Sequence, residues 1–318
     1  MKAAFPSTSA NEIHWQVRDA PRPQPGPKQI LLRVKAASIN RGETVLLKTS
    51  FKEGVGGIDA AGEVVETGAE VTRLKPGDRV TGRCAGGFAE FAAMNEAEAM
   101  AVPASARWED AACLPVSFTV AWDALVVNGN LAKGEIVLVT GVSSAVGVAA
   151  LALAKHAGAT VIGTSGSAEK LARLAALDVP IKTRSANFSK DVLLKTGGKG
   201  ANIAIDAVGA AYFQEILRSL AVNGRFATIG QMTGSPKVEL DMDFFAMRRL
   251  RLYGVSNRLR TPEERAQATR RFAEEVMPAV ASGALKPLVD KVFALDEVEE
   301  AHRYVYADRQ VGKVLIKP

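Results

Sequence analysis

The sequence predicts an α/β fold in two parts, a partly open β-barrel and a doubly wound parallel sheet. Short β-favouring runs fill residues 1–116 and are separated by turns rich in proline and glycine, which is typical of a small barrel. From residue 117 to 256 strand and helix patterns alternate instead, as in a parallel sheet covered by helices. Residues 257–318 end in a strand pattern that we expect to rejoin the barrel, which makes the first domain discontinuous in sequence.

The individual elements follow from their apolar patterns. The expected strands of the barrel are Lys2–Phe5, Ile30–Ala37, Asp59–Thr67 and Arg79–Gly82. Those of the parallel sheet are Ile136–Thr140, Thr160–Thr164, Ile203–Asp206, Arg225–Ile229 and Leu250–Val255. The tail is expected to form a helix over Pro262–Ser282, a strand over Lys291–Ala294, a helix over Asp296–Tyr306 and a strand over Lys313–Ile316.

Composition narrows the class of protein. A chain of 318 residues suits two domains and can bury a substantial core. The net charge of +6 is modest and the basic residues are scattered, apart from Arg248, Arg249 and Arg251, so we expect no nucleic-acid partner. No apolar run reaches the roughly 18 residues of a membrane span. Cys84 and Cys113 cannot build a disulfide framework, so we expect a cytoplasmic protein.

A nucleotide-binding turn is expected between the first two strands of the parallel sheet. The strand ends at Thr140, a turn of small residues follows, and an alanine-rich helix covers Val148–His156. Free N–H groups and the positive end of the helix dipole would face a dinucleotide pyrophosphate there. The turn lacks the second glycine of the usual GxGxxG pattern, so a tight turn that binds nothing is the alternative. The candidate contacts are Gly141, Ser143, Ser144, Ala145, Val146 and Gly147.

The end of the next strand favours NADPH over NADH. An NAD site usually carries an acidic residue there to hold the ribose 2′-OH. Here the strand runs out through hydroxyl and glycine residues, and the next charges are Glu169 and Lys170. Hydroxyls and cations would bind a 2′-phosphate, which an acid would repel. The candidates are Ser165, Ser167 and Lys170, with Thr183 and Arg184 as a second wall.

Several motifs along the chain resemble one family. They are Ala37-Ser38-Ile39-Asn40, Gly57-Ile58-Asp59-Ala60-Ala61-Gly62-Glu63-Val64, Lys75-Pro76-Gly77-Asp78-Arg79-Val80, Gly86-Gly87-Phe88-Ala89-Glu90-Phe91, Leu114-Pro115 followed by Thr119, Asp206-Ala207-Val208-Gly209 and Gly312-Lys313-Val314. In this order they resemble the zinc-free medium-chain dehydrogenase/reductases of the quinone oxidoreductase (zeta-crystallin-like) branch. The resemblance covers essentially the whole chain and implies a GroES-like barrel, a Rossmann NADPH-binding domain over residues 117–256 and a homodimer.

The resemblance also implies a reaction without zinc. Zinc-dependent relatives carry a cysteine after the second strand, a Gly-His-Glu motif and a four-cysteine lobe. Asn40 and Gly57-Ile58-Asp59 stand in the first two places here, and the lobe is missing. His14, His156 and His302 have no cysteine or carboxylate at a ligand spacing.

The implied activity is NADPH-dependent hydride transfer to a quinone or an α,β-unsaturated carbonyl. Asn40 matches the family's cleft asparagine, although it could instead cap a turn, and Thr119 matches a threonine near the nicotinamide. Arg41 could hold a substrate oxyanion. The residues expected to pass the nicotinamide at the ends of later strands are Val208, Gly230, Gln231, Ser256 and Asn257. No proton donor is evident from the sequence.

Two other functions stay open. An enoyl-thioester reductase would need a basic entrance for a carrier phosphate, which the cluster Arg248–Arg251 could supply. A protein that binds NADPH without turnover, as a redox sensor, is the second. In the implied homodimer, edge strands around Val238–Leu240 or Leu250–Val255 would pair.

Overall fold

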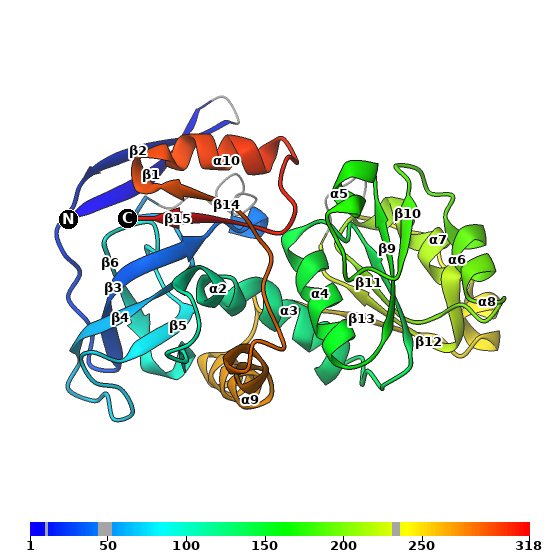
Figure 1. Cartoon of the computed structure of the whole chain (residues 1–318), viewed down its shortest axis with the longest axis horizontal. Coiled ribbons are helices and arrows are strands. Elements are labelled where there is room, and N and C mark those ends of the chain that lie inside the picture. Colours follow the sequence, from blue (N-terminus) through cyan, green and yellow to red (C-terminus); the bar gives the residue numbers. More distant parts are fainter. Residues whose placement is uncertain (10–11, 44–52, 231–235) are drawn as a thin grey trace. The chain divides into compact units, whose positions relative to one another are not determined.

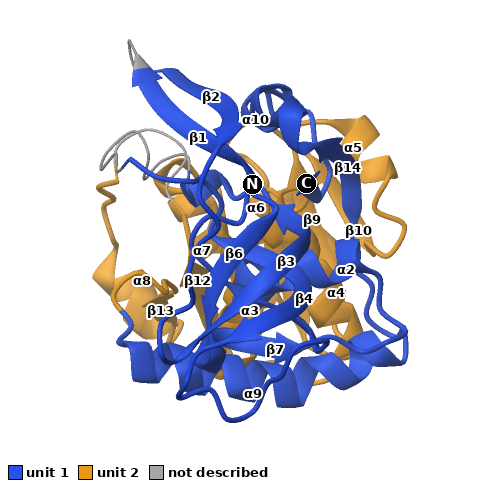
Figure 2. Ribbon diagram, turned by 90° about the vertical axis from the view of Figure 1, so that its left-hand side faces the viewer, with its two compact units in different colours: residues 1–119, 260–318 blue, residues 120–259 orange. Residues whose placement is uncertain are grey.

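The computed structural model describes residues 1–9, 12–43, 53–230 and 236–318. They form two compact units, residues 1–119 with 260–318 (unit 1) and residues 120–259 (unit 2), coloured separately in Figure 2. The first segment of unit 1 ends at Thr119, where the sequence predicts residue 116, and its second begins at Arg260, where the sequence predicts residue 257.

Unit 1 is built on an antiparallel sheet (Figure 1). Within the described residues its strands run in the order β14-β15-β3-β4-β5-β7, and β6 also pairs with β3. Only β14 and β15 are parallel to each other among these pairs. A separate antiparallel hairpin joins β1 and β2. The strands are β1 (Lys2–Ser9), β2 (Glu12–Asp19), β3 (Gln29–Ser38), β4 (Asp59–Thr67), β5 (Arg79–Arg83), β6 (Phe91–Asn95), β7 (Ala99–Ala101), β14 (Val289–Ala294) and β15 (Lys313–Lys317).

The C-terminal strand joins the sheet beside the end of β3. Leu315 pairs with Ser38, and the Ile39 N–H donates to the Val314 carbonyl at 3.0 Å. β3 is buried along most of its length and supplies two cores, Ile30 and Leu32 to one and the residues near its end to the other. The pairing brings Lys313, at the start of β15, next to the end of β3.

The fully described α-helices of unit 1 include α2 (Trp108–Ala112), α9 (Pro262–Ala281) and α10 (Val298–Tyr306). α9 begins with a capping box, in which Thr261 and Glu264 exchange side-chain and backbone hydrogen bonds. A π-helical turn over Leu114–Phe118 follows α2, and 3₁₀ turns cover Glu96–Glu98 and Leu295–Glu297. None of the described helices in either unit has the length and apolar character needed to cross a membrane.

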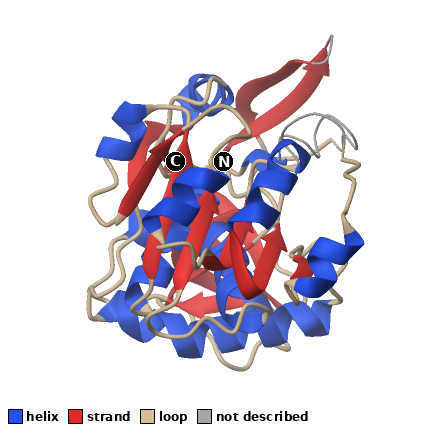
Figure 3. Ribbon diagram, turned by 90° about the vertical axis from the view of Figure 1, so that its right-hand side faces the viewer, coloured by secondary structure: helices blue, strands red, loops and turns tan. Residues whose placement is uncertain are grey.

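Unit 2 is a doubly wound sheet. Its described strands run in the order β10-β9-β8-β11-β12-β13, and every neighbouring pair is parallel. Helices cover both faces of the sheet (Figure 3), α4 and α5 on one and α6 and α7 on the other (Figure 1). The strands are β8 (Ile136–Thr140), β9 (Thr160–Ser165), β10 (Val179–Lys182), β11 (Ala201–Asp206), β12 (Leu220–Thr228) and β13 (Arg251–Gly254). The helices are α3 (Thr119–Trp122, at the boundary), α4 (Ala145–His156), α5 (Ala168–Ala172), α6 (Ser189–Lys195), α7 (Phe213–Ser219) and α8 (Met242–Met247), with a π-helical turn over Asp123–Val127 and a 3₁₀ turn over Ala210–Tyr212.

The structure differs from the sequence prediction at several element ends. α4 begins at Ala145 rather than Val148, because the Ser144 hydroxyl accepts from the Gly147 N–H and starts the helix one turn earlier. β12 begins at Leu220 rather than Arg225. β2 was not predicted, since its polar residues suit a strand only when β1 pairs with it.

Gly62 of β4 pairs with Val34 of β3 and has no room for a side chain. A Cβ at this position would lie 2.2 Å from the Arg33 carbonyl oxygen. That oxygen belongs to the backbone of β3, so it cannot move aside as the end of a flexible side chain could. We expect Gly62→Ala to lower the free energy of unfolding by about 1–3 kcal/mol, measured by urea denaturation. Gly254→Ala is the matched strand control, because nothing lies within 4 Å of its Cβ position. Equal losses of stability in the two variants would contradict this account.

Candidate functional site

The turn between β8 and α4 is folded back on itself. The Val142 N–H donates to the Thr164 carbonyl (3.0 Å) and the Ser144 N–H to the Gly141 carbonyl (2.9 Å). Gly141 has a φ of +61°, in the left-handed region that favours glycine. A Cβ at Gly147 would lie 2.5 Å from the Gly141 carbonyl oxygen, so only glycine lets the helix start so close to the turn.

Ser143 stands where the usual pattern has its second glycine. Its side chain is buried, and its Oγ lies 3.3 Å from the Oγ of Ser165 at the end of β9. The two hydroxyls therefore tie the turn to the tip of the next strand. Three N–H groups of the turn, those of Ser143, Ala145 and Val146, have no partner among the described residues, and they remain available to an anion.

Asp206 holds the loop after β11, which lies against this turn, by accepting hydrogen bonds. It ends β11, which lies beside β8 at the point where the strand order reverses. Its carboxylate accepts from the Thr140 hydroxyl (2.5 Å) and from the N–H groups of Val208 (2.9 Å) and Gly209 (3.0 Å). Burial raises the pKa of Asp206, and these hydrogen bonds oppose that rise. The loop is thereby held against the turn, where Val208 Cγ2 would lie 3.2 Å from a Cβ at Gly141.

A hollow of about 520 Å³ lies next to the tip of β9. Arg184 lies along it, and its Nε donates to the Gly166 carbonyl at 3.2 Å. A Cβ at Gly166 would lie 2.6 Å from Arg184 Cγ, so the glycine makes room for this side chain. The hollow contains two cations and no carboxylate. Its lining is Gly166, Lys182, Thr183, Arg184, Ser185 and Asn187.

The structure separates the residues that the sequence grouped as a 2′-phosphate site. Thr183 and Arg184 line the hollow, whereas Lys170, within α5, does not. The Ser165 hydroxyl is bonded to Ser143, and the Ser167 hydroxyl caps α5 by accepting from the Lys170 N–H. Sequence reasoning missed Lys182, although a cation directly before Thr183-Arg184 was a usable signal.

The remaining candidates of unit 2 lie after later strands. Gly230 follows β12, and a Cβ there would have the Ala207 carbonyl as its nearest neighbour, at 3.7 Å. Gly230 therefore lies beside the loop that Asp206 holds. Ser256 and Asn257 follow β13, and the Ser256 hydroxyl accepts from the Arg258 N–H. Gln231 falls outside the described residues.

In unit 1, Asn40 belongs to a buried polar cluster. The Lys313 ammonium donates to Asn40 Oδ1 (2.7 Å) and to Ser38 Oγ (2.8 Å). Asn40 Nδ2 donates to Asp59 Oδ2 (3.0 Å) and to the Ser38 carbonyl (3.1 Å), and Ser38 Oγ donates to Asp59. Lys313 is 1% exposed and Asp59 0%. Asn40 thus joins a buried ammonium to a buried carboxylate, and its amide N–H groups are already bonded within the protein.

Burial and charge act in opposite directions on Lys313. Burial lowers the pKa of its ammonium, and the Asp59 carboxylate opposes that shift. The cluster is formed by three chain segments, the end of β3, the start of β4 and the start of β15.

Arg41 and Thr119 are both engaged within unit 1. The Arg41 guanidinium donates to the Val305 carbonyl (2.8 Å) and to Asp308, so it caps the C-terminal end of α10. The Thr119 hydroxyl lies 2.7 Å from the Pro115 carbonyl and 3.0 Å from that of Val116. Both arrangements are those of a structural side chain.

Glu43 is a buried acid that sequence reasoning missed. Its side chain is 6% exposed, and Oε1 accepts from the Gly57 N–H at 2.6 Å. Burial raises the pKa of Glu43 to about 7, and the Gly57 N–H partly opposes this rise. Nothing in the local sequence indicates that a glutamate three residues after Asn40 should be buried.

The two cysteines are poor nucleophiles. Burial raises the pKa of Cys113 to about 12 and also raises that of Cys84. Thiols with raised pKa values remain protonated and unreactive at neutral pH. Over the described part of the chain, no three His, Cys, Asp or Glu side chains are grouped so that they could hold a metal ion.

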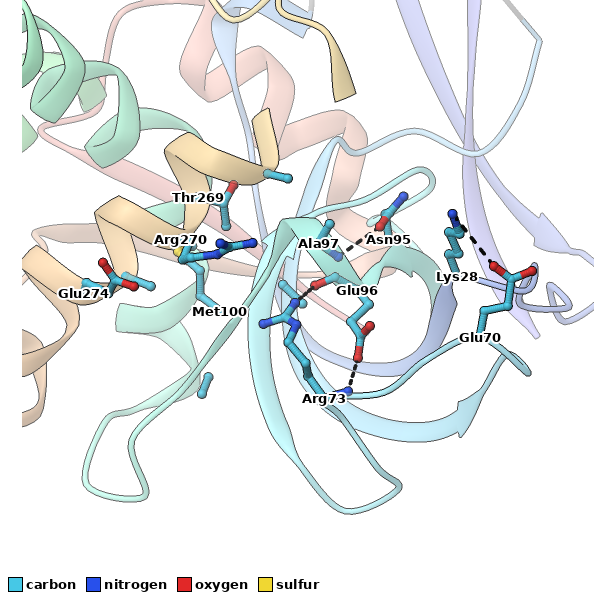
Figure 4. A pocket seen from close by; sticks show the side chains of 14 residues that line it. Lys28, Glu70, Arg73, Asn95, Glu96, Ala97, Met100, Thr269, Arg270 and Glu274 are labelled. Carbon is cyan, nitrogen blue, oxygen red and sulfur yellow. Dashed lines mark hydrogen bonds and ion pairs between the residues drawn. The ribbon is translucent and has the colours of Figure 1, made fainter. Parts of the chain in front are cut away.

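A second hollow lies beside α9 in unit 1 (Figure 4). Most of the charged side chains that line this hollow are bonded to other groups of the protein. Lys28 pairs with Glu70 at 3.8 Å, Arg73 donates to the Glu96 carbonyl, and the Glu96 carboxylate accepts from the N–H groups of residues 72–74. Cations and carboxylates of equal number line it, so it lacks the net positive charge that a phosphate requires.

Replacing Lys313 tests the buried cluster. We expect Lys313→Met to lower the free energy of unfolding by about 3–5 kcal/mol, because Asp59 would stay buried without its ammonium. Adding Asp59→Asn should recover part of this loss, since the carboxylate is then neutral. Urea denaturation at neutral pH measures both, and a Lys313→Met variant as stable as the wild type would refute the account.

Comparisons with known proteins agree with the two-unit fold described above. Residues 26–104 match the family model described as alcohol dehydrogenase GroES-like domain, and residues 145–274 match that described as zinc-binding dehydrogenase. The chain is 28% identical to a mycobacterial protein solved in complex with NADPH, with a TM-score of 0.88 and coverage of 100% of both chains.

Curated relatives include an acryloyl-coenzyme A reductase, polyketide synthases and a quinone oxidoreductase-like protein. Acryloyl-coenzyme A reductase of Metallosphaera sedula is 28% identical over 95% of this chain and 96% of its own length. The chain also matches highly reducing polyketide synthases, such as one of Cordyceps militaris, but spans only 12% of its length. The quinone oxidoreductase-like protein 2 homolog of Nematostella vectensis is 31% identical over 92% of this chain and 82% of its own length. The chain therefore belongs to the medium-chain dehydrogenase/reductase family of oxidoreductases, in its quinone oxidoreductase-like branch.

Proposed function

We propose that this protein is an NADPH-dependent oxidoreductase that reduces a quinone or an α,β-unsaturated carbonyl. The observation that carries the proposal is the cationic hollow at the tip of β9, which contains Lys182 and Arg184 and no carboxylate. A carboxylate at this place holds the ribose hydroxyl of NAD, whereas cations attract the additional phosphate of NADPH.

The residues of unit 2 fit the parts of NADPH. The unpartnered N–H groups of Ser143, Ala145 and Val146, at the positive end of α4, would bind the pyrophosphate. Lys182 and Arg184 would bind the 2′-phosphate, and the loop carrying Val208, with Gly230 beside it, would pass the nicotinamide. When bound, NADPH supplies a hydride. The work of the chain is then to orient the two reactants and to stabilise the negative charge that forms on the acceptor oxygen.

We further propose that the reaction needs no metal. The place where zinc-dependent relatives carry their first ligand is taken by Asn40, whose amide is bonded to Lys313 and Asp59. An ammonium in this cluster would repel a divalent cation, and it already neutralises the carboxylate. Acceptors that are electron-poor by themselves take a hydride without a Lewis acid.

An enoyl-thioester reductase is the second candidate. The similarity to acryloyl-coenzyme A reductase favours it, and so do Arg249 and Arg251, whose side chains are exposed. Arg248 is less available because its guanidinium donates to the Leu220 carbonyl.

We also propose a homodimer. Among the described strands, β13 is the last of the sheet of unit 2, and it carries the exposed Leu252. An unpaired strand edge is suited to pairing with a second copy.

A panel of acceptors tests the proposed activity. We expect NADPH consumption, followed by its absorbance, with a naphthoquinone or a short enone. Faster turnover of crotonyl thioester than of both would favour the enoyl-thioester reductase. NADPH binding by calorimetry without consumption in any assay would instead indicate a sensor.

The choice between NADPH and NADH is tested at the hollow. We expect Arg184→Ala to raise the KM for NADPH about tenfold or more and to leave that for NADH nearly unchanged, because the lost cation faces only the 2′-phosphate. Lys182→Ala should act in the same direction. Lys199→Ala, an exposed lysine of unit 2 outside the hollow, is the matched control. If KM rose equally for NADPH and NADH, the 2′-phosphate would not be bound in this hollow.

A further inference from the structure

The cationic hollow of unit 2 offers several donors that are not used within the protein. The Lys182 ammonium has no hydrogen-bond or ion-pair partner among the described residues, and neither do the two terminal nitrogens of Arg184. The Ser185 hydroxyl and the Asn187 amide nitrogen are likewise without a partner there. All four side chains are exposed and line the hollow. The oxygens of a ligand phosphate can therefore reach them directly.

These donors do not hold a phosphate at one fixed position. Arg184 is anchored by its Nε, which donates to the Gly166 carbonyl at 3.2 Å. The Thr183 hydroxyl is used inside the loop, since it lies 2.8 Å from the Ser185 carbonyl oxygen and accepts from the Ser185 N–H at 3.1 Å. Lys182 carries its charge on a long, flexible side chain. The hollow of about 520 Å³ thus supplies positive charge over a region larger than one phosphate group.

The lining of the hollow also contains nothing that would reject a phosphate at a neighbouring position. None of the described lining residues carries a carboxylate. Discrimination against a close analogue requires a clash, a like charge or a polar group that the analogue leaves unpaired. We therefore expect the hollow to accept a phosphate on either of two neighbouring oxygens of one ribose.

We propose that unit 2 also binds coenzyme A and its thioesters, in competition with NADPH, an inference that rests on the NADPH site proposed above. Both molecules contain adenosine with a pyrophosphate on its 5′-oxygen. NADPH carries its additional phosphate on the 2′-oxygen of that ribose, and coenzyme A carries one on the neighbouring 3′-oxygen. The N–H groups of Ser143, Ala145 and Val146 would take the pyrophosphate of either molecule, and Lys182 and Arg184 would take the additional phosphate.

The two sets of phosphate contacts belong to one connected part of unit 2. The turn is joined to the end of β9 by the Ser143 and Ser165 hydroxyls, 3.3 Å apart, and the Ser165 carbonyl accepts from the Thr183 N–H at 2.9 Å. Because these bonds hold the turn and the hollow together, a ligand that carries both phosphate groups on one nucleoside can engage both at once. A ligand that lacks either group loses one set of contacts and binds more weakly.

Binding of coenzyme A would regulate the reduction without any chemical change in the inhibitor. One turn cannot hold two pyrophosphates, so a bound thioester would exclude NADPH and leave the acceptor unreduced. The inhibition is therefore competitive, which means that it raises the KM for NADPH and leaves kcat unchanged. Reduction would slow whenever thioesters accumulate relative to NADPH.

Two isomeric fragments test the hollow directly. Adenosine 2′,5′-bisphosphate and adenosine 3′,5′-bisphosphate differ only in the ribose oxygen that carries the second phosphate. We expect their dissociation constants, measured by calorimetry, to agree within about tenfold, because nothing in the lining selects one position. A larger preference for the 2′,5′ isomer would overturn the proposal.

Acetyl-coenzyme A tests the competition in the full chain, since it has neither a free thiol nor a double bond conjugated to its carbonyl. We expect it to displace NADPH in fluorescence titrations and to inhibit the reduction of a naphthoquinone competitively with NADPH. Its 3′-dephospho analogue should bind at least about tenfold more weakly, because the missing phosphate would face Lys182 and Arg184.

Variants of the hollow show whether both ligands use the same cations. Arg184→Ala should weaken NADPH and acetyl-coenzyme A together, by about tenfold each, and should leave NADH and the dephospho analogue nearly unchanged. Lys199→Ala, at an exposed lysine of unit 2 outside the hollow, is the matched control, and thermal unfolding checks that each variant is folded. The proposal is overturned if acetyl-coenzyme A fails to displace bound NADPH, or if Arg184→Ala weakens NADPH alone. A wild type that binds no NADPH would instead refute the proposed function, and this inference with it.

Discussion

The buried ammonium of Lys313 is the interaction on which the polar cluster of unit 1 depends. Taking an ammonium out of water costs several kcal/mol, and this cost is offset only where acceptors and an opposite charge surround it. Ser38 and Asn40 supply the acceptors, and Asp59 supplies the charge. These residues lie at the end of β3 and the start of β4, while the ammonium comes from β15. The C-terminal strand therefore completes the cluster as well as the sheet.

Burial, with a smaller contribution from the Asp59 carboxylate, determines the state of Glu43. One ammonium can neutralise one buried carboxylate, and Asp59 already takes that place. Glu43 is a second buried acid near this carboxylate. Burial raises its pKa to about 7, and its Oε1 accepts one hydrogen bond, from the Gly57 N–H. Burial thus raises the pKa of both thiols of unit 1, and it also raises the pKa of Glu43 in the same unit.

The turn of unit 2 that could bind an anion differs from the usual GxGxxG turn at one position, Ser143. The close approach of Gly147 to the Gly141 carbonyl brings the start of α4 onto the turn. Where a second glycine would leave the turn unattached, the Ser143 hydroxyl bonds to Ser165 at the tip of β9. This bond links the turn to the strand whose end borders the cationic hollow. The proposed pyrophosphate and 2′-phosphate contacts therefore lie on one connected piece of structure.

The sequence by itself determined the fold class and the tight turn between β8 and α4, because apolar periodicity and turn chemistry are properties of contiguous residues. It also showed that no acid ends β9, which is likewise a local fact. The tertiary structure alone decided what buried polar side chains do. The sequence left open whether Asn40 faces the cleft or caps a turn, and it suggested that Arg41 holds a substrate oxyanion. In the structure the Asn40 amide is bonded to Asp59 and Lys313, and the Arg41 guanidinium to Val305 and Asp308. Glu43 was overlooked for the same reason. Burial, pairing and protonation depend on which distant segments meet, and the order of residues does not state that.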